Sequence, residues 1–167
     1  MFEPADSLCE RHREFVPLIA AVERVEESPS EAAELRAEAI TLHQAFAHGL
    51  IPHAVGEGRT VFPVLRRITG SSRESTEMTH EHREISRLTD ELERIADELE
   101  RTDVGAVPKE HALRAVLRDL RTVVRDHFEQ EEALCFRILS SELGPEEGRS
   151  LYEAMERAAA DLRSAYE

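Results

Sequence analysis

The chain has few of the residues that crosslink small proteins or build sheets. Its 167 residues include only two cysteines, 126 positions apart, which excludes a disulfide framework. Glycine and proline number seven each, and no alternating run rich in valine and isoleucine marks a strand. No apolar run approaches the length of a membrane span. The sequence therefore predicts an all-α fold that is long enough for one domain, residues 1–167, with a buried core.

Basic residues are scarce. The chain has 21 Lys and Arg against 35 Asp and Glu, for a net charge of −14. This excess of negative charge argues against nucleic acid and against an anionic membrane surface as partners. The opening Met-Phe-Glu-Pro-Ala-Asp lacks the basic and apolar regions of a signal peptide. We therefore expect a cytoplasmic protein with no nucleic-acid partner and no membrane partner.

One motif occurs twice in this chain. It consists of a His, a Glu four residues later and a Phe nine residues after the His: His53, Glu57 and Phe62, then His127, Glu131 and Phe136. On a helix, positions four apart lie on one face, one turn from each other, so the imidazole and the carboxylate can reach one metal ion. A single such pair is most often an exposed helical pair. The repetition gives the pattern its weight.

A further His precedes each copy in a similar context. Leu8-Cys-Glu-Arg-His12-Arg-Glu-Phe15 parallels Met78-Thr-His-Glu-His82-Arg-Glu-Ile85, and the offsets between the repeats are 70 and 74 residues. The chain is therefore a tandem pair of two-helix units. Four His and two Glu facing one apolar core would be costly if unpaired, and a metal satisfies them together. The candidate ligands are His12, His53, Glu57, His82, His127 and Glu131.

These motifs resemble the hemerythrin-like HHE cation-binding family, and Val61-Phe62-Pro63 is similar to its apolar-Phe-Pro ending. The resemblance covers about residues 5 to 140. It implies a four-helix bundle with two non-haem irons and an oxo or hydroxo bridge. The four His would be terminal ligands, with Glu57 and Glu131 as bridging carboxylates. One departure stands out: the acidic residue that usually follows the ligand Glu is Glu132 in the second copy but Gly58 in the first.

The resemblance also implies a small ligand, O2, hydrogen peroxide or nitric oxide, at an open iron position. Oxygen-carrying hemerythrins add a His four residues from the third-helix ligand, where this chain has Met78 and Ser86 around His82. A reversible oxygen carrier is therefore not expected. Three hypotheses stay open: a catalase-like enzyme that decomposes peroxide, a module that senses O2, nitric oxide or iron, and iron storage. The sequence leaves the oligomeric state, monomer or dimer, undecided.

Apolar periodicity predicts five helices, the first four forming an up-down-up-down bundle and the last packing across it. The first helix is expected from residue 4 or 5 to 27, and the second from a cap at 28–31 to 68–70. The third should run from 71 or 72 to about 102, the fourth from 108 to about 143, and the fifth over about 145–166. Gly49 and Pro52 crowd His53, so either a bend or π-bulge precedes it, or a new helix starts near Ile51. The continuous, bent helix is favoured.

Three further expectations concern residues near the ligands. His80 is two positions from His82, about 200° round the helix, and should face outward. The inner face of the fourth helix should continue through Leu134 and Ile138. Cys9 and Cys135 each stand about one turn from a ligand and should lie in the layer just beyond the metals, with a packing role or a redox role.

Overall fold

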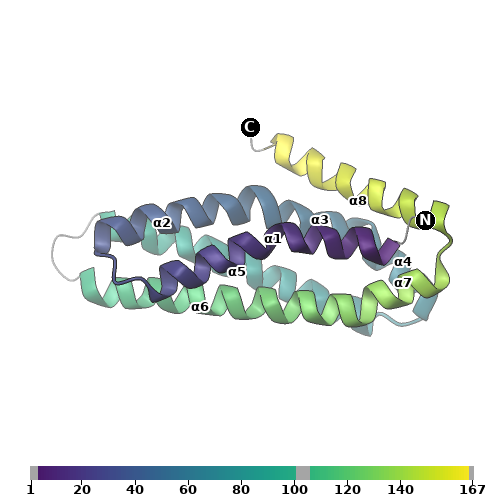
Figure 1. Cartoon of the computed structure of the whole chain (residues 1–167), viewed down its shortest axis with the longest axis horizontal. Coiled ribbons are helices and arrows are strands. Elements are labelled where there is room, and N and C mark those ends of the chain that lie inside the picture. The colour runs from purple at the N-terminus through teal and green to yellow at the C-terminus, as the bar shows by residue number, and fades with distance from the viewer. Residues whose placement is uncertain (1–3, 101–105, 166–167) are drawn as a thin grey trace.

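The computed structural model describes residues 4–100 and 106–165, and every regular element within these ranges is a helix (Figure 1). The predicted all-α class is confirmed. None of these helices combines the length and the apolar character that a membrane span requires. The elements are α1 (Pro4–Glu27), α2 (Ala32–Ala45), α3 (Ile51–Arg59), α4 (Val61–Thr69), α5 (Arg73–Glu100), α6 (Ala106–Gln130), α7 (Arg137–Glu142) and α8 (Pro145–Ala165), with π-helical turns η1 (Phe46–Leu50) and η2 (Glu131–Phe136).

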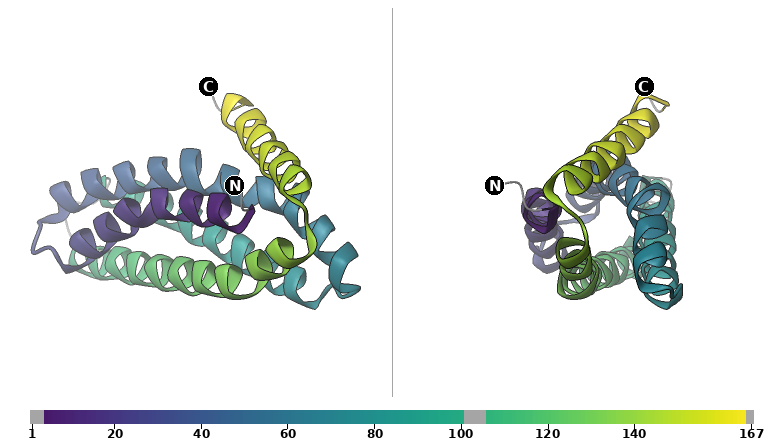
Figure 2. Two further views of the ribbon diagram at one scale, coloured as in Figure 1. Left: turned by 45° about the vertical axis from the view of Figure 1, so that its right-hand side comes forward. Right: turned by 90° about the vertical axis from the view of Figure 1, so that its right-hand side faces the viewer.

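Four helical rods form the bundle (Figure 1). The first rod is α1, and the second consists of α2, η1, α3 and α4. The third rod is α5, and the fourth consists of α6, η2 and α7. α1 contacts α2 and α6, and α5 contacts the same two helices from the other side. The end-on view in Figure 2 shows the rods around a square, with α8 outside it. α8 packs mainly on α3. The predicted bundle with an added C-terminal helix is thus the observed architecture.

The start of the second rod differs from the expected cap. α2 begins at Ala32, and its N-cap, Glu31, makes no side-chain cap hydrogen bond. The hydroxyl of Ser28 instead accepts from the N–H of Ser30 at 3.2 Å. Arg114 of α6 then donates to the carbonyls of Val25, Glu26 and Ser30 at 2.8, 2.9 and 3.2 Å. The side chain of Arg114 therefore satisfies carbonyls at the C-terminal end of α1. The turn stabilises that end and does not cap the start of α2.

The predicted distortion before His53 is present. The N–H of Ile51 bonds to the carbonyl of Phe46, five residues back, so the second rod contains a π-helical turn and continues into α3. Pro52, which has no N–H, follows this turn directly. The rod is interrupted once more at Thr60, between α3 and α4, and it ends after Thr69 at Gly70, whose φ of 66° suits glycine.

A second π-helical turn, η2, was not anticipated and corrects the predicted inner face of the fourth rod. Leu134, expected inside, is 40% exposed, whereas Cys135 and Leu139 are fully buried. A π-helical turn accommodates an extra residue, which moves the buried face one position along the chain. The same inward set includes Phe136.

α8 is held against α3 by a close approach of backbones. Its buried apolar side chains are Met155 and Ala159. A Cβ atom at Gly56 would lie 2.7 Å from the carbonyl oxygen of Met155, which is far inside contact distance. Glycine at this position therefore allows the two helices to meet.

Replacing Gly56 with alanine should destabilise the protein by about 1–3 kcal/mol, because the new methyl group must displace the backbone of α8. Gly58→Ala is the matched control: it lies two residues away in the same helix with nothing within 4 Å of its Cβ position. That change should stabilise slightly, by up to about 1 kcal/mol through helix propensity. Chemical denaturation of both variants tests this. Equal stabilities would show that α8 does not depend on Gly56.

Candidate metal centre

The six candidate residues form one polar layer between two apolar clusters. On α1, Leu8 belongs to the smaller cluster and Phe15 to the larger one, with His12 between them. On α5, Met78 and Ile85 bracket the layer in the same way. Each rod therefore delivers its polar residues at the same height of the bundle. The apolar residues on either side fix that height, since a shift of one turn would bury the polar groups among them.

The structure brings all six candidates together. The side chains of His12, His53, Glu57, His127 and Glu131 are at most 2% exposed, and His82 is 11% exposed. The two carboxylates come from the helical rods of the two repeated motifs, and each faces histidines of both halves of the chain. The layer is thus assembled across the bundle and not within either hairpin.

The distances show how Glu57 is shared. Its Oε1 lies 3.1 Å from Nε2 of His53 and 3.7 Å from Nε2 of His12, and its Oε2 lies 3.5 Å from Nε2 of His82. Potential ligand atoms of His12, His53 and Glu57 lie within 4.8 Å of one another, as do those of the set Glu57, His82, His127 and Glu131. Glu57 is common to both sets, as expected for a carboxylate between two cations.

Glu131 has a similar position from the opposite side. Its Oε2 lies 3.5 Å from Nε2 of His12 and 3.3 Å from Nε2 of His127. The Nε2 atoms of His82 and His127 are only 3.0 Å apart. Ring nitrogens from all four rods therefore point at a small volume that also holds two carboxylates.

The buried atoms of this layer are left unsatisfied. All four carboxylate oxygens of Glu57 and Glu131, Nε2 of His12 and both ring nitrogens of His53 have no hydrogen-bond partner among the described residues. Buried polar atoms are almost always paired, because leaving them unpaired costs several kcal/mol each. Imidazole nitrogens with carboxylate oxygens suit iron among the common metals. The residues present therefore fit a pair of iron ions.

Two further carboxylates hold histidine rings from outside the layer. Nδ1 of His12 lies 3.0 Å from Oε1 of Glu132, and Nδ1 of His127 lies 2.8 Å from Oε2 of Glu81. Such contacts orient a ring so that its Nε2 faces inward. No sequence pattern selects Glu81, because it pairs with a histidine 46 positions away on another helix. The sequence indicated Glu132 only as the acidic residue that follows the ligand Glu131 in the second copy of the motif.

Aromatic rings pack on the layer at corresponding positions of the two repeated motifs. Phe62 stacks on His82 with centroids 5.2 Å apart, and Phe136 packs against His12 at 5.1 Å. In a regular α-helix a residue nine after the motif His would lie about 180° round from it. The break at Thr60 and the π-helical turn η2 each fall between the Glu and the Phe, and both phenylalanines are buried. The irregular turns thus let Glu and Phe of one motif face the same core.

The histidines and carboxylates of the layer shift one another's pKa values. Burial opposes the charged form of His12 and of His127, but their contacts with Glu131 and other carboxylates outweigh it and raise their pKa to about 9 and about 10. Burial, reinforced by the charge on His127, lowers the pKa of His82 to about 4 despite the attraction of Glu57. Although burial alone would raise it, neighbouring histidines hold the pKa of Glu57 well below its usual value. The imidazolium forms of His12 and His127 are thus favoured beside the two carboxylates.

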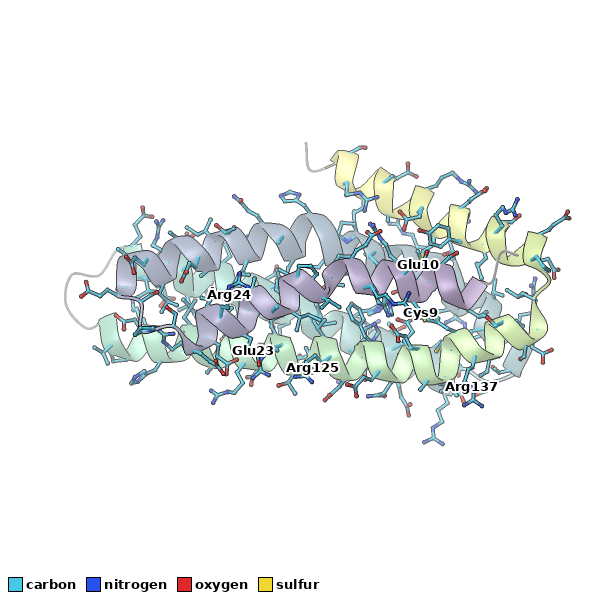
Figure 3. The ribbon with its side chains drawn as sticks, viewed as in Figure 1. Cys9, Glu10, Glu23, Arg24, Arg125 and Arg137 are labelled. Atoms are coloured by element: carbon cyan, nitrogen blue, oxygen red, sulfur yellow. The ribbon has the colours of Figure 1, made fainter. Side chains whose placement is uncertain are left out.

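The remaining histidines lie elsewhere. His80 is exposed as predicted, His48 and His111 are exposed, and His43 lies beside Glu93 at 3.8 Å. Cys135 is buried in the smaller apolar cluster beyond the layer, and Cys9, labelled on α1 in Figure 3, packs against that cluster. Burial, with the nearby Glu131, raises the pKa of Cys135 to about 12. Its burial and the raised pKa favour the neutral thiol and a packing role.

Comparison with known proteins finds a family match over most of the chain. The family model described as the hemerythrin HHE cation binding domain matches residues 3–139. That range contains all six candidate ligands together with Glu81 and Glu132. No curated protein and no solved structure matches the chain significantly.

The metal-free protein should lose stability as the pH rises from 6.5 to 8.5. Folded His12 and His127 keep their protons up to about pH 9 and about pH 10, whereas unfolded histidines lose theirs near 6.5. The folded state therefore binds more protons, and unfolding becomes easier by on the order of 1 kcal/mol per pH unit for each retained proton. Urea denaturation at several pH values measures this slope. Glu131→Gln should flatten it, and a stability that rises over this window would contradict the assignment.

Proposed function

The chain belongs to the hemerythrin HHE cation-binding family, and on that basis we propose that it is a non-haem di-iron protein that acts on a small oxidant, hydrogen peroxide first among them. His12, His53, Glu57, His82, His127 and Glu131 would hold the two irons, with the two carboxylates shared between them. The observation that supports this most is the convergence of fully buried, unsatisfied carboxylate oxygens and imidazole nitrogens on one volume.

Bound iron would supply redox chemistry and a coordination position open to a small ligand. The chain's own residues contribute orientation and the exclusion of water. Glu132 and Glu81 hold His12 and His127 with Nε2 directed inward. Phe62 and Phe136 cover histidine rings. Apart from these groups, the described residues near the layer include no obvious acid or base, so the residues position the metal and leave the chemistry to it.

Iron-reconstituted protein should contain two irons per chain, because the layer has two ligand sets that share Glu57. Glu57→Ala or Glu131→Ala should remove most of this iron, since each carboxylate serves both positions. Metal analysis by mass spectrometry of the desalted proteins measures the ratio.

His80→Ala is the matched control, because His80 is exposed and only two residues from His82. It should retain both irons. A wild-type content of one iron or none, or a loss of iron in His80→Ala but not in Glu131→Ala, would refute the proposed centre.

A sensing role is the second candidate, and one feature favours it: α8 touches residues next to two ligands. Gly56, which meets Met155, directly precedes Glu57, and Arg11, which precedes His12, lies 3.4 Å from Glu156. A change in the metal layer could therefore move α8, where a partner would read it.

A peroxide-consumption assay alongside the optical spectrum separates the two candidates. An enzyme should consume many equivalents of hydrogen peroxide per chain, with the near-ultraviolet iron absorption preserved. A sensor should change its spectrum after about one equivalent and then stop. Glu131→Ala protein, treated in the same way, gives the background. Consumption no greater than this background would exclude the enzymatic proposal.

A further inference from the structure

Two grooves lie beside the metal layer, and the repeat relates them. One is lined by His12, Arg13, Val16, Ile19, Arg125, Phe128, Glu129 and Glu132. Applying the offsets of 70 and 74 residues to these positions yields seven residues that line the other groove: Ile51, Ala54, Val55, Gly58, His82, Arg83 and Ser86. The grooves are therefore counterparts, one beside His12 and one beside His82. Differences between them must come from the side chains.

The groove beside His12 is closed off from its histidine. Phe128 stacks on the ring of His12 with centroids 3.9 Å apart, and Glu132 bonds to its Nδ1. Only 2% of the His12 side chain is exposed. The walls also include the charged residues Arg125, labelled in Figure 3, and Glu129. An incoming molecule therefore meets a covered ring. Charged residues line both grooves, Arg125 and Glu129 here and Arg87 and Asp90 beside His82, so the cover over the ring is what distinguishes the two.

The groove beside His82 is open because the corresponding residues are small. Ala54 stands where the other groove has Phe128, and Gly58 stands where it has Glu132. A Cβ atom at Gly58 would have nothing within 4 Å. His82 is 11% exposed, more than any other candidate ligand. These two differences in side chains leave the layer more accessible from the side of His82.

The open groove has the size and lining of an organic-ligand site. Its volume of about 440 Å³ exceeds what O2 or hydrogen peroxide occupies and lies in the range of about 300–1,000 Å³ typical of ligand pockets. Ile51, Ala54 and Val55 from α3 form an apolar wall, and the charged residues Arg83, Arg87 and Asp90 line the side of α5. On α5, the hydroxyl of Thr79 donates to the carbonyl of Ser75 at 2.6 Å, and that of Ser86 donates to the carbonyl of His82 at 3.0 Å. Both hydroxyl oxygens can therefore act towards a ligand only as hydrogen-bond acceptors.

We propose that this groove binds a small organic hydroperoxide, with its hydrocarbon part along Ile51, Ala54 and Val55 and its peroxide end towards His82. The apolar wall matches the hydrocarbon, and the hydroxyl oxygens of Thr79 and Ser86 match the donating O–H group. The identity of the ligand as an oxidant rests on the proposed function. The groove and its shape do not depend on metal.

The test is a binding titration on metal-free protein with 2-phenyl-2-propanol, an inert alcohol with the shape of cumene hydroperoxide. Methyl NMR should show saturable shifts at Ile51, Ala54 and Val55. Gly58→Leu should weaken binding at least about tenfold, because its side chain fills the space that nothing else occupies. Gly58 is exposed on a helix, so the variant should fold, and circular dichroism checks this.

Val16→Leu is the matched control, since it adds bulk to the groove beside His12 at a residue that is 56% exposed. It should leave the affinity unchanged. Shifts centred on the groove beside His12, wild-type affinity in Gly58→Leu, or no saturable binding would each overturn the proposal. Because no iron is needed, a protein that binds the alcohol but no iron would refute the proposed function alone. A protein with two irons and no alcohol binding would refute this inference alone.

Discussion

The burial of two carboxylates in an apolar bundle is the constraint on which this structure depends. Glu57 and Glu131 are fully buried, and their oxygens have no hydrogen-bond partner in the described part of the chain. Carboxylates in such a position require positive charge close by. Histidines from all four rods provide it, either as imidazolium groups or as ligands of a cation. The outer contacts of Glu81 and Glu132 hold the rings of His127 and His12 in place.

The repeat is preserved where the layer is built and lost where the layer meets solvent. The phenylalanines that follow the motifs, Phe62 and Phe136, each pack on a histidine of the other half. At the positions that line the grooves, the first half has Gly58 and Ala54 where the second half has Glu132 and Phe128. The candidate ligands therefore correspond between the two halves, whereas the side chains that cover them do not. His12 is covered by Phe128 and Glu132, and His82 has no counterpart of these two among the described residues. A bound molecule would then reach one metal position before the other.

The irregular turns have a function in this arrangement. A regular helix cannot direct a His, a Glu four residues later and a Phe nine residues later to one core, because the Phe would lie about 180° from the His. The interruption at Thr60 and the π-helical turn Glu131–Phe136 resolve this conflict at corresponding places in the two motifs. Distortions of this kind often occur at functional sites. Here they position an aromatic cover over a histidine.

The sequence by itself determined the helical class, the tandem units and the six residues of the layer, because helical spacing and repetition are local properties that the chain displays directly. The distortion before His53 was also predictable, since Gly49 and Pro52 disfavour a regular helix there. The tertiary structure alone decided which carboxylates orient the rings, since Glu81 meets His127 only across two rods. It also decided where the π-helical turn η2 shifts the buried face and exposes Leu134, and that Gly58 and Ala54 line a groove beside His82. Packing between the rods determines which residues meet and where a helix departs from 3.6 residues per turn, and helical periodicity carries no information about either.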